Sequence, residues 1–147
     1  MFSTRETMLT DEGGLAIRLY NKTGSVTEKG TVVTLSNTSS ESFTKLNAAD
    51  STVAVVIGSQ PAFFGVVLES GIANGSRAWV VVSGVARVKV TSDVYYGDIV
   101  LVNYDENGVT VTGNTADKEN FFGIGMALSG VLLPGVIEGA IVCLRHY

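Results

Sequence analysis

The residues best suited to nucleophilic catalysis are the single cysteine and the single histidine of the chain, Cys143 and His146. A thiol nucleophile needs a base within hydrogen-bonding reach. Cys143 lies in the apolar run Ala140-Ile-Val-Cys-Leu144, which is typical of a buried strand. Side chains three positions apart on a strand point to opposite faces. The spacing therefore argues against a catalytic Cys–His pair.

Four acidic residues could supply the paired carboxylates of a glycoside hydrolase: Asp93, Asp98, Asp105 and Glu106. The strand pattern places them at strand ends and turns, where carboxylates are usually solvated. The segment Asp105-Glu-Asn-Gly108 carries oxygen ligands but lacks the alternating spacing of a calcium loop. Because Asn-Gly supplies the positive φ of a tight turn, a hairpin is the better interpretation.

The composition of the chain disfavours enzymes, metal sites and nucleic-acid binding. Its 147 residues fit one domain, with 46% hydrophobic and 16% charged residues. A net charge of −4 would repel a phosphate backbone. One cysteine excludes an intramolecular disulfide framework and a zinc knuckle, and the pair Gly123-Ile-Gly125 is not followed by the helical pattern of a dinucleotide site. We expect no enzymatic activity, no cofactor and no nucleic-acid partner.

Two segments bear on targeting and membranes. The stretch from Met1 to Glu12 contains no apolar run of secretory length. The uncharged stretch from Phe121 to Ile137 approaches the length of a membrane span, but several glycines and Pro134 interrupt it. Two strands joined by a Gly-Pro turn explain it better, so we expect neither a signal peptide nor a membrane partner.

The hydrophobic pattern predicts β-structure almost throughout. Short runs rich in valine, threonine and aromatic residues alternate with Gly, Asn, Asp and Ser clusters. The strands are expected at residues 15–20, 31–35, 43–46, 53–57, 63–68, 77–82, 85–91, 98–103, 108–112, 121–128 and 140–145. No helix longer than a turn or two is expected. The fold class predicted is all-β, a small barrel or sandwich of about ten short strands.

An ordered set of motifs occurs twice along the chain. Gly30-Thr-Val-Val33 corresponds to Gly97-Asp-Ile-Val100, and Phe63-Phe-Gly65 corresponds to Phe121-Phe-Gly123. In each copy a further strand lies between the two motifs, and a final strand follows them. This predicts two similar halves, residues 28–83 and 95–145, with the same strand order and packed face to face around one core.

The first 13 residues follow no strand or helix period and are largely polar. We expect an extended N-terminal arm, residues 1–13, that precedes a single barrel domain, residues 14–147. The arm would be ordered by an outside surface through backbone pairing and a few side chains. The candidate contact residues are Phe2, Arg5, Met8 and Leu9.

Aromatic residues indicate self-association. Adjacent rings in a Phe-Phe doublet lie on opposite faces of a strand, so one ring needs cover from a loop or another subunit. Trp79 lies in a run that is apolar on both faces, which favours a core or interface position over sugar stacking. The candidate oligomer-interface residues are Phe63, Trp79, Tyr95, Tyr96 and Phe121.

The order of six motifs over residues 28–145 resembles a known family. The motifs are Gly30-Thr-Val-Val33, Gly65-Val-Val-Leu-Glu69, the run from Gly75 to Val88, Tyr96-Gly-Asp-Ile-Val100, Gly108-Val-Thr-Val-Thr112 and Gly123-Ile-Gly-Met-Ala-Leu128. Together they resemble the small β-barrel capsid decoration (cement) proteins of tailed bacteriophages and their prophage relatives. The bulky Trp79, Tyr95 and Tyr96 depart from the family's pattern.

The resemblance implies a non-enzymatic structural protein of the virion. Such a protein is made in the host cytoplasm, lies on the outer surface of the capsid, binds the major capsid protein and forms homotrimers at three-fold positions. The alternative is a receptor- or carbohydrate-binding module of a phage fibre. Its site would be sought at Tyr104 with Asp105, or at Tyr95 and Tyr96 with Asp98.

Overall fold

The computed structural model describes residues 6–35, 41–45, 64–91, 93–105, 108–113, 122–130 and 140–144. These residues form the strands β1 (Thr7–Leu9), β2 (Gly14–Asn21), β3 (Val32–Leu35), β4 (Ser42–Lys45), β5 (Phe64–Val67), β6 (Arg77–Val88), β7 (Ile99–Asp105), β8 (Gly108–Thr112), β9 (Phe122–Ala127) and β10 (Ala140–Leu144). The all-β prediction is confirmed. Over the same ranges no helix is long and apolar enough to span a bilayer. The strand expected at 53–57 lies outside the described residues.

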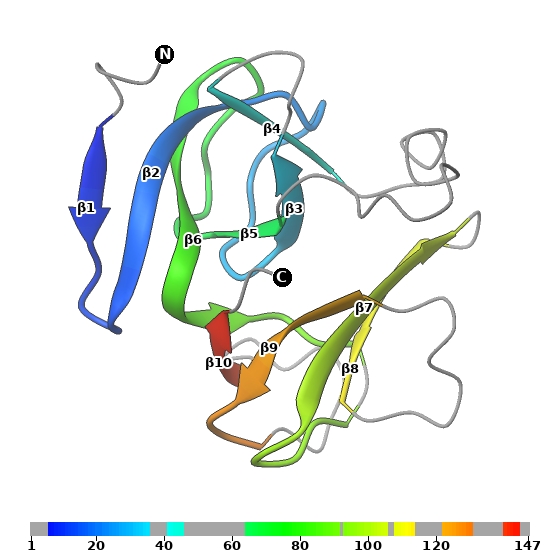
Figure 1. Ribbon diagram of the computed structural model, residues 1–147. Helices are drawn as coiled ribbons and strands as arrows, with labels where there is room; N and C mark the ends of the chain where they lie inside the picture. Colours follow the sequence, from blue (N-terminus) through cyan, green and yellow to red (C-terminus); the bar gives the residue numbers. More distant parts are fainter. Residues whose placement is uncertain are drawn as a thin grey trace.

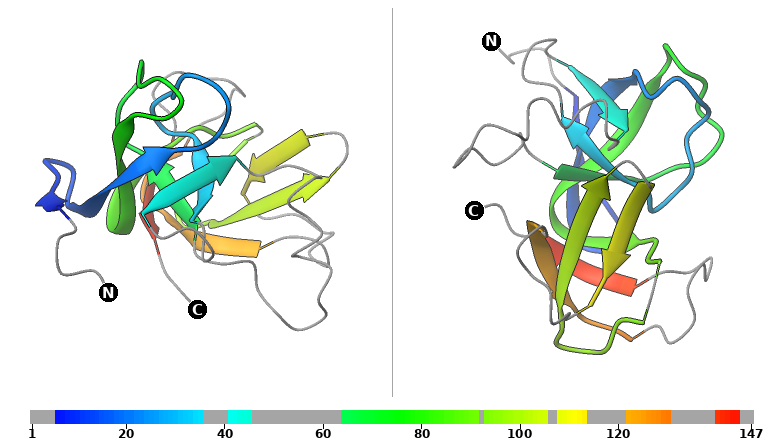
Figure 2. Two further views of the ribbon diagram at one scale, coloured as in Figure 1. Left: turned by 90° about the horizontal axis from the view of Figure 1, so that it is seen from above. Right: turned by 90° about the vertical axis from the view of Figure 1, so that its right-hand side faces the viewer.

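The first half is a closed five-stranded barrel (Figure 1). Its order is β2-β4-β3-β5-β6, and it closes because β6 also pairs with β2. The β2–β4 pair is parallel and the other pairs are antiparallel. Strand β6 then continues into a second sheet with the order β6-β10-β9-β7-β8, which lies below the barrel in Figure 1 and in the right view of Figure 2.

The two strands expected at 77–82 and 85–91 are one long strand, which corrects the prediction. Gly84 has a φ of 78°, and the pairing with β2 shifts register between Leu15 and Ala16. Because glycine adopts this left-handed conformation without a Cβ penalty, the strand bends here while it stays paired. Strand β6 thus belongs to both halves and joins them.

The expected repeat in strand order is confirmed. The first half has the order β4-β3-β5-β6, and the second half has the corresponding order β8-β7-β9-β10. Turns before β3 and β7 match in detail: the N–H of Gly30 donates to the oxygen of Val67 (2.8 Å), and the N–H of Gly97 donates to that of Ala127 (2.9 Å). Both glycines have positive φ, 90° and 88°.

A hydrogen bond after the strand in the shared position also matches between the two halves. In the first, the N–H of Lys22 after β2 donates to the oxygen of Phe43 on β4 (2.9 Å). In the second, the N–H of Thr91 after β6 donates to the oxygen of Val111 on β8 (2.8 Å). The C-terminal part of β6 therefore takes the place in the second half that β2 takes in the first.

The strand register changes one pair of residues that the repeat had matched, Gly65 with Gly123. Gly65 is paired with Val33, and Gly125 is paired with Val100. Since Val33 and Val100 occupy the same position after their turns, Gly125 rather than Gly123 is the counterpart of Gly65. A bulge between Val100 and Leu101 inserts one residue of β9 and so accounts for one of the two positions of this offset.

Two clusters of buried residues make up the described core. The interior of the first barrel holds Ile17, Leu19, Val33, Phe43, Val67, Ala78 and Val80. The larger cluster combines residues of both halves: Ala16, Val32, Val66, Val81, Ala86, Val88, Val90, Val94, Val100, Val102, Val111, Ile124 and Ala127. The expectation of two halves packed face to face around one core is therefore wrong, because the first half closes around its own interior cluster. Strand β6 and the larger cluster join the halves.

Part of the expected N-terminal arm belongs to the chain's own sheet. Strand β1 pairs antiparallel with β2, with Met8 opposite Ala16 and Leu9 opposite Leu15. Met8 packs against the larger core cluster. The expectation that an outside surface orders the arm is thus wrong for residues 6–13, because β2 of the same chain pairs with them. Backbone pairing over three residues needs no side-chain period. Phe2 and Arg5 lie outside the described residues.

Candidate interaction surfaces

One of the candidate catalytic carboxylates, that of Asp98, has a structural role. The carboxylate of Asp98 accepts a hydrogen bond from the N–H of Tyr95 (2.9 Å), so it caps the turn before β7. The carbonyl of Asp93 accepts from the N–H of Gly113 (3.4 Å). His146 and Glu106 lie outside the described residues. Within the described ranges, no group of three His, Cys, Asp or Glu residues could hold a metal ion.

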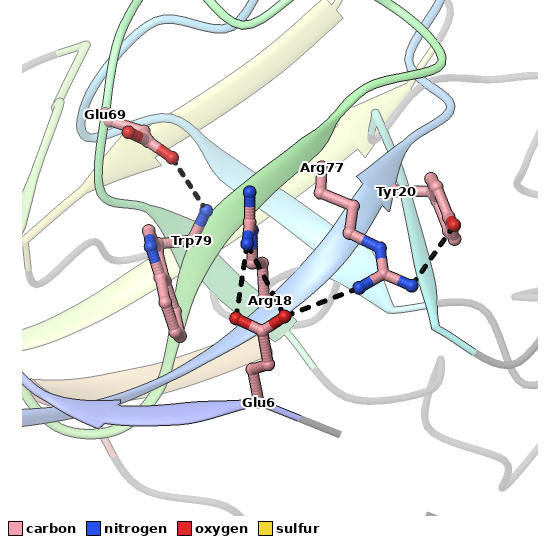
Figure 3. Close-up of polar contacts among 6 residues, drawn as sticks. All are labelled: Glu6, Arg18, Tyr20, Glu69, Arg77 and Trp79. Carbon is pink, nitrogen blue, oxygen red and sulfur yellow. Dashed lines mark hydrogen bonds and ion pairs between the residues drawn. The ribbon is translucent and has the colours of Figure 1, made fainter. Parts of the chain in front are cut away.

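Charged side chains fix the start of β1 on the outside of the first barrel (Figure 3). The carboxylate of Glu6 pairs with the guanidinium groups of Arg18 (3.2 Å) and Arg77 (3.6 Å). Arg77 also donates to the hydroxyl of Tyr20 (3.2 Å) and lies over its ring, with 4.8 Å between the guanidinium carbon and the ring centroid. The hydrogen bond to Tyr20 is the largest of the effects that raise the pKa of Arg77.

The turn between β1 and β2 is attached to both halves of the molecule. The carboxylate of Glu12 lies 3.5 Å from the ammonium of Lys29 and 3.5 Å from the guanidinium of Arg87. The N–H of Val85 donates to the oxygen of Gly13 (3.2 Å). The hollow beside these residues has no room for a water molecule. It is a packed junction and not a ligand pocket.

The outer edge of β1 can pair with the backbone of another chain. We call this edge, together with the exposed side chains of Leu9 and Leu15, the hairpin surface. The N–H of Arg18 donates to the oxygen of Glu6, and the N–H of Thr10 donates to the oxygen of Gly14. Since bonded and non-bonded positions alternate in an antiparallel pair, the backbone N–H of Leu9 points away from β2. Leu9 is 81% exposed. In the part of the chain that is described, β1 pairs with β2 alone.

A second apolar surface lies on the second half, and we call it the tyrosine surface. Its exposed side chains are Tyr95, Tyr96, Ile99, Met126 and Leu128. Ile99 is directly opposite Met126 on the paired strands β7 and β9. The hydrogen bond from the N–H of Gly97 to the oxygen of Ala127 holds the tyrosine turn beside the end of β9. These side chains therefore form one patch.

Trp79, another predicted interface residue, does not belong to this patch. Trp79 lies on β6 in the first barrel, is half-buried against the larger core cluster, and its backbone N–H donates to the carboxylate of Glu69 (3.1 Å) (Figure 3). Phe63 and Phe121 lie outside the described residues. Sequence reasoning missed Ile99, Met126 and Leu128. These three residues are apolar and lie in segments whose two faces are both apolar, which is the feature of the sequence that could have indicated an exposed apolar face.

Comparison with known proteins assigns no family to the chain. No protein-family model matches it, and no curated protein is significantly similar to it in sequence. Function is therefore inferred from the motifs and the two surfaces.

Proposed function

We propose that this chain is a structural protein of the virion that decorates and stabilises the outside of a bacteriophage capsid. It would bridge major capsid protein subunits and act as a homotrimer. The motifs that resemble the decoration proteins support this, because they lie on the strands that build the two halves. Gly30-Thr-Val-Val33 leads into β3, and Tyr96-Gly-Asp-Ile-Val100 leads into β7.

The architecture suits a mechanical role. A protein that ties shell subunits together against outward pressure has to resist deformation. In the described residues, valine-rich cores fill the two halves, and β6 runs through both. Close-packed interiors have low compressibility, so such a body transmits strain between its contact points.

The observation that carries the proposal is the free edge of β1 with Leu9 at its end. An exposed strand edge can pair with an extended segment of another protein, which supplies main-chain hydrogen bonds. Leu9, with 81% of its surface exposed, adds an apolar contact next to that edge. A shell subunit that pairs with β1 would hold the barrel by a strand that, among the described residues, pairs on one side only.

Replacing Leu9 with proline tests this contact. Proline removes the outward N–H of residue 9 without removing a bond to β2, and proline is tolerated at strand edges. We expect Leu9→Pro to weaken binding to undecorated particles at least about tenfold, which corresponds to about 1.4 kcal/mol. The thermal unfolding temperature should change little. Binding is measured by co-sedimentation with emptied particles.

Two variants serve as controls for this experiment. Leu9→Ala keeps the N–H and should weaken binding less than Leu9→Pro. Val26→Ala changes another exposed apolar side chain, 61% exposed, and should leave binding unchanged. Full binding by Leu9→Pro would contradict the edge contact. Deleting residues 2–5 tests Phe2 and Arg5 separately, whereas deleting 2–12 would also remove β1 and the Met8 packing.

The alternative function, a receptor- or carbohydrate-binding module of a fibre, is favoured by the exposed tyrosines. Tyr95 and Tyr96 are 56% and 78% exposed on one turn. Flat aromatic rings at such positions can stack on sugars, and a glycan-binding screen tests this. The copy number per particle separates the two functions. A decoration protein occurs in near-stoichiometric ratio to shell subunits, while a fibre module occurs in few copies.

The proposed function also predicts that the protein has no catalytic residues. Cys143→Ser and His146→Ala should leave folding and particle binding unchanged, since neither function involves a nucleophile or a base. The measurement is particle binding of each purified variant beside the parent chain. Loss of particle stabilisation by a variant that still folds and binds would contradict a purely structural role.

A further inference from the structure

Residues 6–13, which we call the strap, are attached to the rest of the protein by few backbone contacts. Strand β1 has three residues, and in the described part of the chain it pairs on one side only. At its two ends, the N–H of Arg18 donates to the oxygen of Glu6 (3.2 Å), and the N–H of Thr10 donates to the oxygen of Gly14 (2.8 Å). A two-stranded pair of this size is marginally stable by itself in water. Side-chain contacts must therefore supply much of the attachment.

Apolar packing supplies only part of what is needed. The strap has two large apolar side chains, Met8 and Leu9. Met8 is half-buried and packs against the larger core cluster, whereas Leu9 is exposed. Thr7, between Glu6 and Met8, is exposed as well. A single half-buried methionine is a weak anchor for a segment of eight residues, so the charged side chains of the strap become important.

The first end of the strap is held by a carboxylate between two cations (Figure 3). Glu6 lies 3.2 Å from the guanidinium of Arg18 on β2 and 3.6 Å from that of Arg77 on β6. Arg77 is kept in place without Glu6, because it also donates to the hydroxyl of Tyr20. The Glu6 side chain is 47% exposed, so dissolved ions reach these pairs and screen them.

The second end of the strap is held in the same way. The Glu12 carboxylate lies 3.5 Å from the ammonium of Lys29 and 3.5 Å from the guanidinium of Arg87. Its Oε2 atom is shielded from solvent and accepts no hydrogen bond from the described residues. The hollow beside it has no room for a water molecule. A carboxylate oxygen in this position is costly unless cations lie near it, so this end also depends on ion pairing.

We propose that the strap is held by charge and that ionic strength regulates the hairpin surface. The strap lies on β2 while Glu6 and Glu12 are paired with their cations. Salt weakens exposed ion pairs but leaves apolar packing in place, so the strap leaves β2 while both halves stay folded around their buried clusters. Since β1 forms the hairpin surface, salt then reduces the share of molecules that present it. The consequence for capsid binding rests on the proposed function, whereas the attachment of the strap does not.

Hydrogen exchange of the isolated full-length chain tests the proposal, because an amide exchanges when its hydrogen bond opens. The amides of Thr10 and Arg18 report on the strap, and the amide of Lys22, which donates to Phe43, reports on the first barrel. At about 1 M salt the screening length falls to about 3 Å, which is shorter than the ion-pair distances. Between about 0.05 and 1 M salt, exchange at Thr10 and Arg18 should become at least about fivefold faster relative to Lys22. A constant ratio overturns the proposal.

The double variant Glu6→Gln, Glu12→Gln separates charge from other salt effects. It removes all four ion pairs of the strap and should speed exchange at Thr10 and Arg18 at least about tenfold at low salt. Its exchange should then no longer respond to salt. Asp11→Asn is the matched control, since Asp11 lies in the same turn, is exposed and makes no ion pair within the described ranges. Exchange equal to that of the parent chain, or a salt response that persists, overturns the proposal. The salt series on the parent chain does not depend on whether the double variant folds.

Particle binding separates this proposal from the capsid role. A double variant with fast strap exchange should bind undecorated particles more weakly than the parent chain. Fast exchange with unchanged particle binding would contradict the capsid contact at the hairpin surface and leave the charge-held strap standing. Unchanged exchange together with weakened binding by Leu9→Pro would overturn the charge-held strap and leave the capsid contact standing.

Discussion

Replacing Gly84 with alanine should lower the free energy of unfolding by about 3 kcal/mol or more. Gly84 has a φ of 78°, which costs an L-residue with a Cβ about 1–2 kcal/mol. A Cβ at this position would also lie 2.5 Å from the carbonyl oxygen of Gly13 and 3.1 Å from the Cα of Gly14. Both contacts are with backbone, which cannot move without breaking the β2–β6 pairing.

Gly71→Ala provides the matched control for the conformational part of this effect. Gly71 has a φ of 88°, and a Cβ there would meet nothing within 4 Å. This variant should lose only the conformational part, about 1–2 kcal/mol. Urea denaturation followed by tryptophan fluorescence measures both, since Trp79 lies on the same strand as Gly84. Equal losses in the two variants would contradict the close approach of the hairpin turn to β6.

Gly84 also illustrates what the sequence could and could not predict about the fold. The Ser83-Gly84 pair was expected to separate two strands, and the structure does place an irregularity there. Glycine at a positive φ can end a strand or bend it, and composition does not distinguish the two. The outcome depends on β2 and β10, which pair on either side of the bend and come from distant parts of the chain.

The internal repeat was visible in the sequence, but its register was not. The glycine-led motifs at Gly30 and Gly97 predicted equivalent turns because the same backbone conformation requires glycine in both. The Phe-Phe-Gly motifs suggested that Gly123 matches Gly65. A bulge inserts one residue into a strand pair without any obligatory residue type, so the part of the offset that the bulge causes could not be predicted from spacing.

The interaction surfaces were also predicted only in part from the sequence. Tyr95 and Tyr96 were predicted as interface residues from their size and type, and the structure places both on an exposed turn. Ile99 and Met126 are of the same residue class as buried strand residues. Their exposure follows from the lack of a cover over the second half in the described residues, which is a property of tertiary structure.

Replacing Phe43 with alanine should destabilise the first barrel by about 3–5 kcal/mol. Phe43 is 0% exposed and belongs to the cluster that fills the barrel interior. It lies on β4, a strand of four residues that pairs with β2 and β3 and so closes the barrel. The loss includes the transfer free energy of the ring and the cavity left behind. Because domains have only about 5–15 kcal/mol of stability, this is a large fraction of the total.

The repeat supplies the control for this prediction. Val111 occupies the position of Phe43 in the second half and is 4% exposed. Val111→Ala removes two methyl groups, so it should cost about 2 kcal/mol and less than Phe43→Ala. Phe43→Leu should also be milder, because leucine refills part of the cavity. Chemical denaturation of the three variants, compared at equal slope, gives the free energies. A loss below about 1.5 kcal/mol for Phe43→Ala would mean that the barrel interior collapses around the smaller side chain, and that closure at β4 does not depend on the ring.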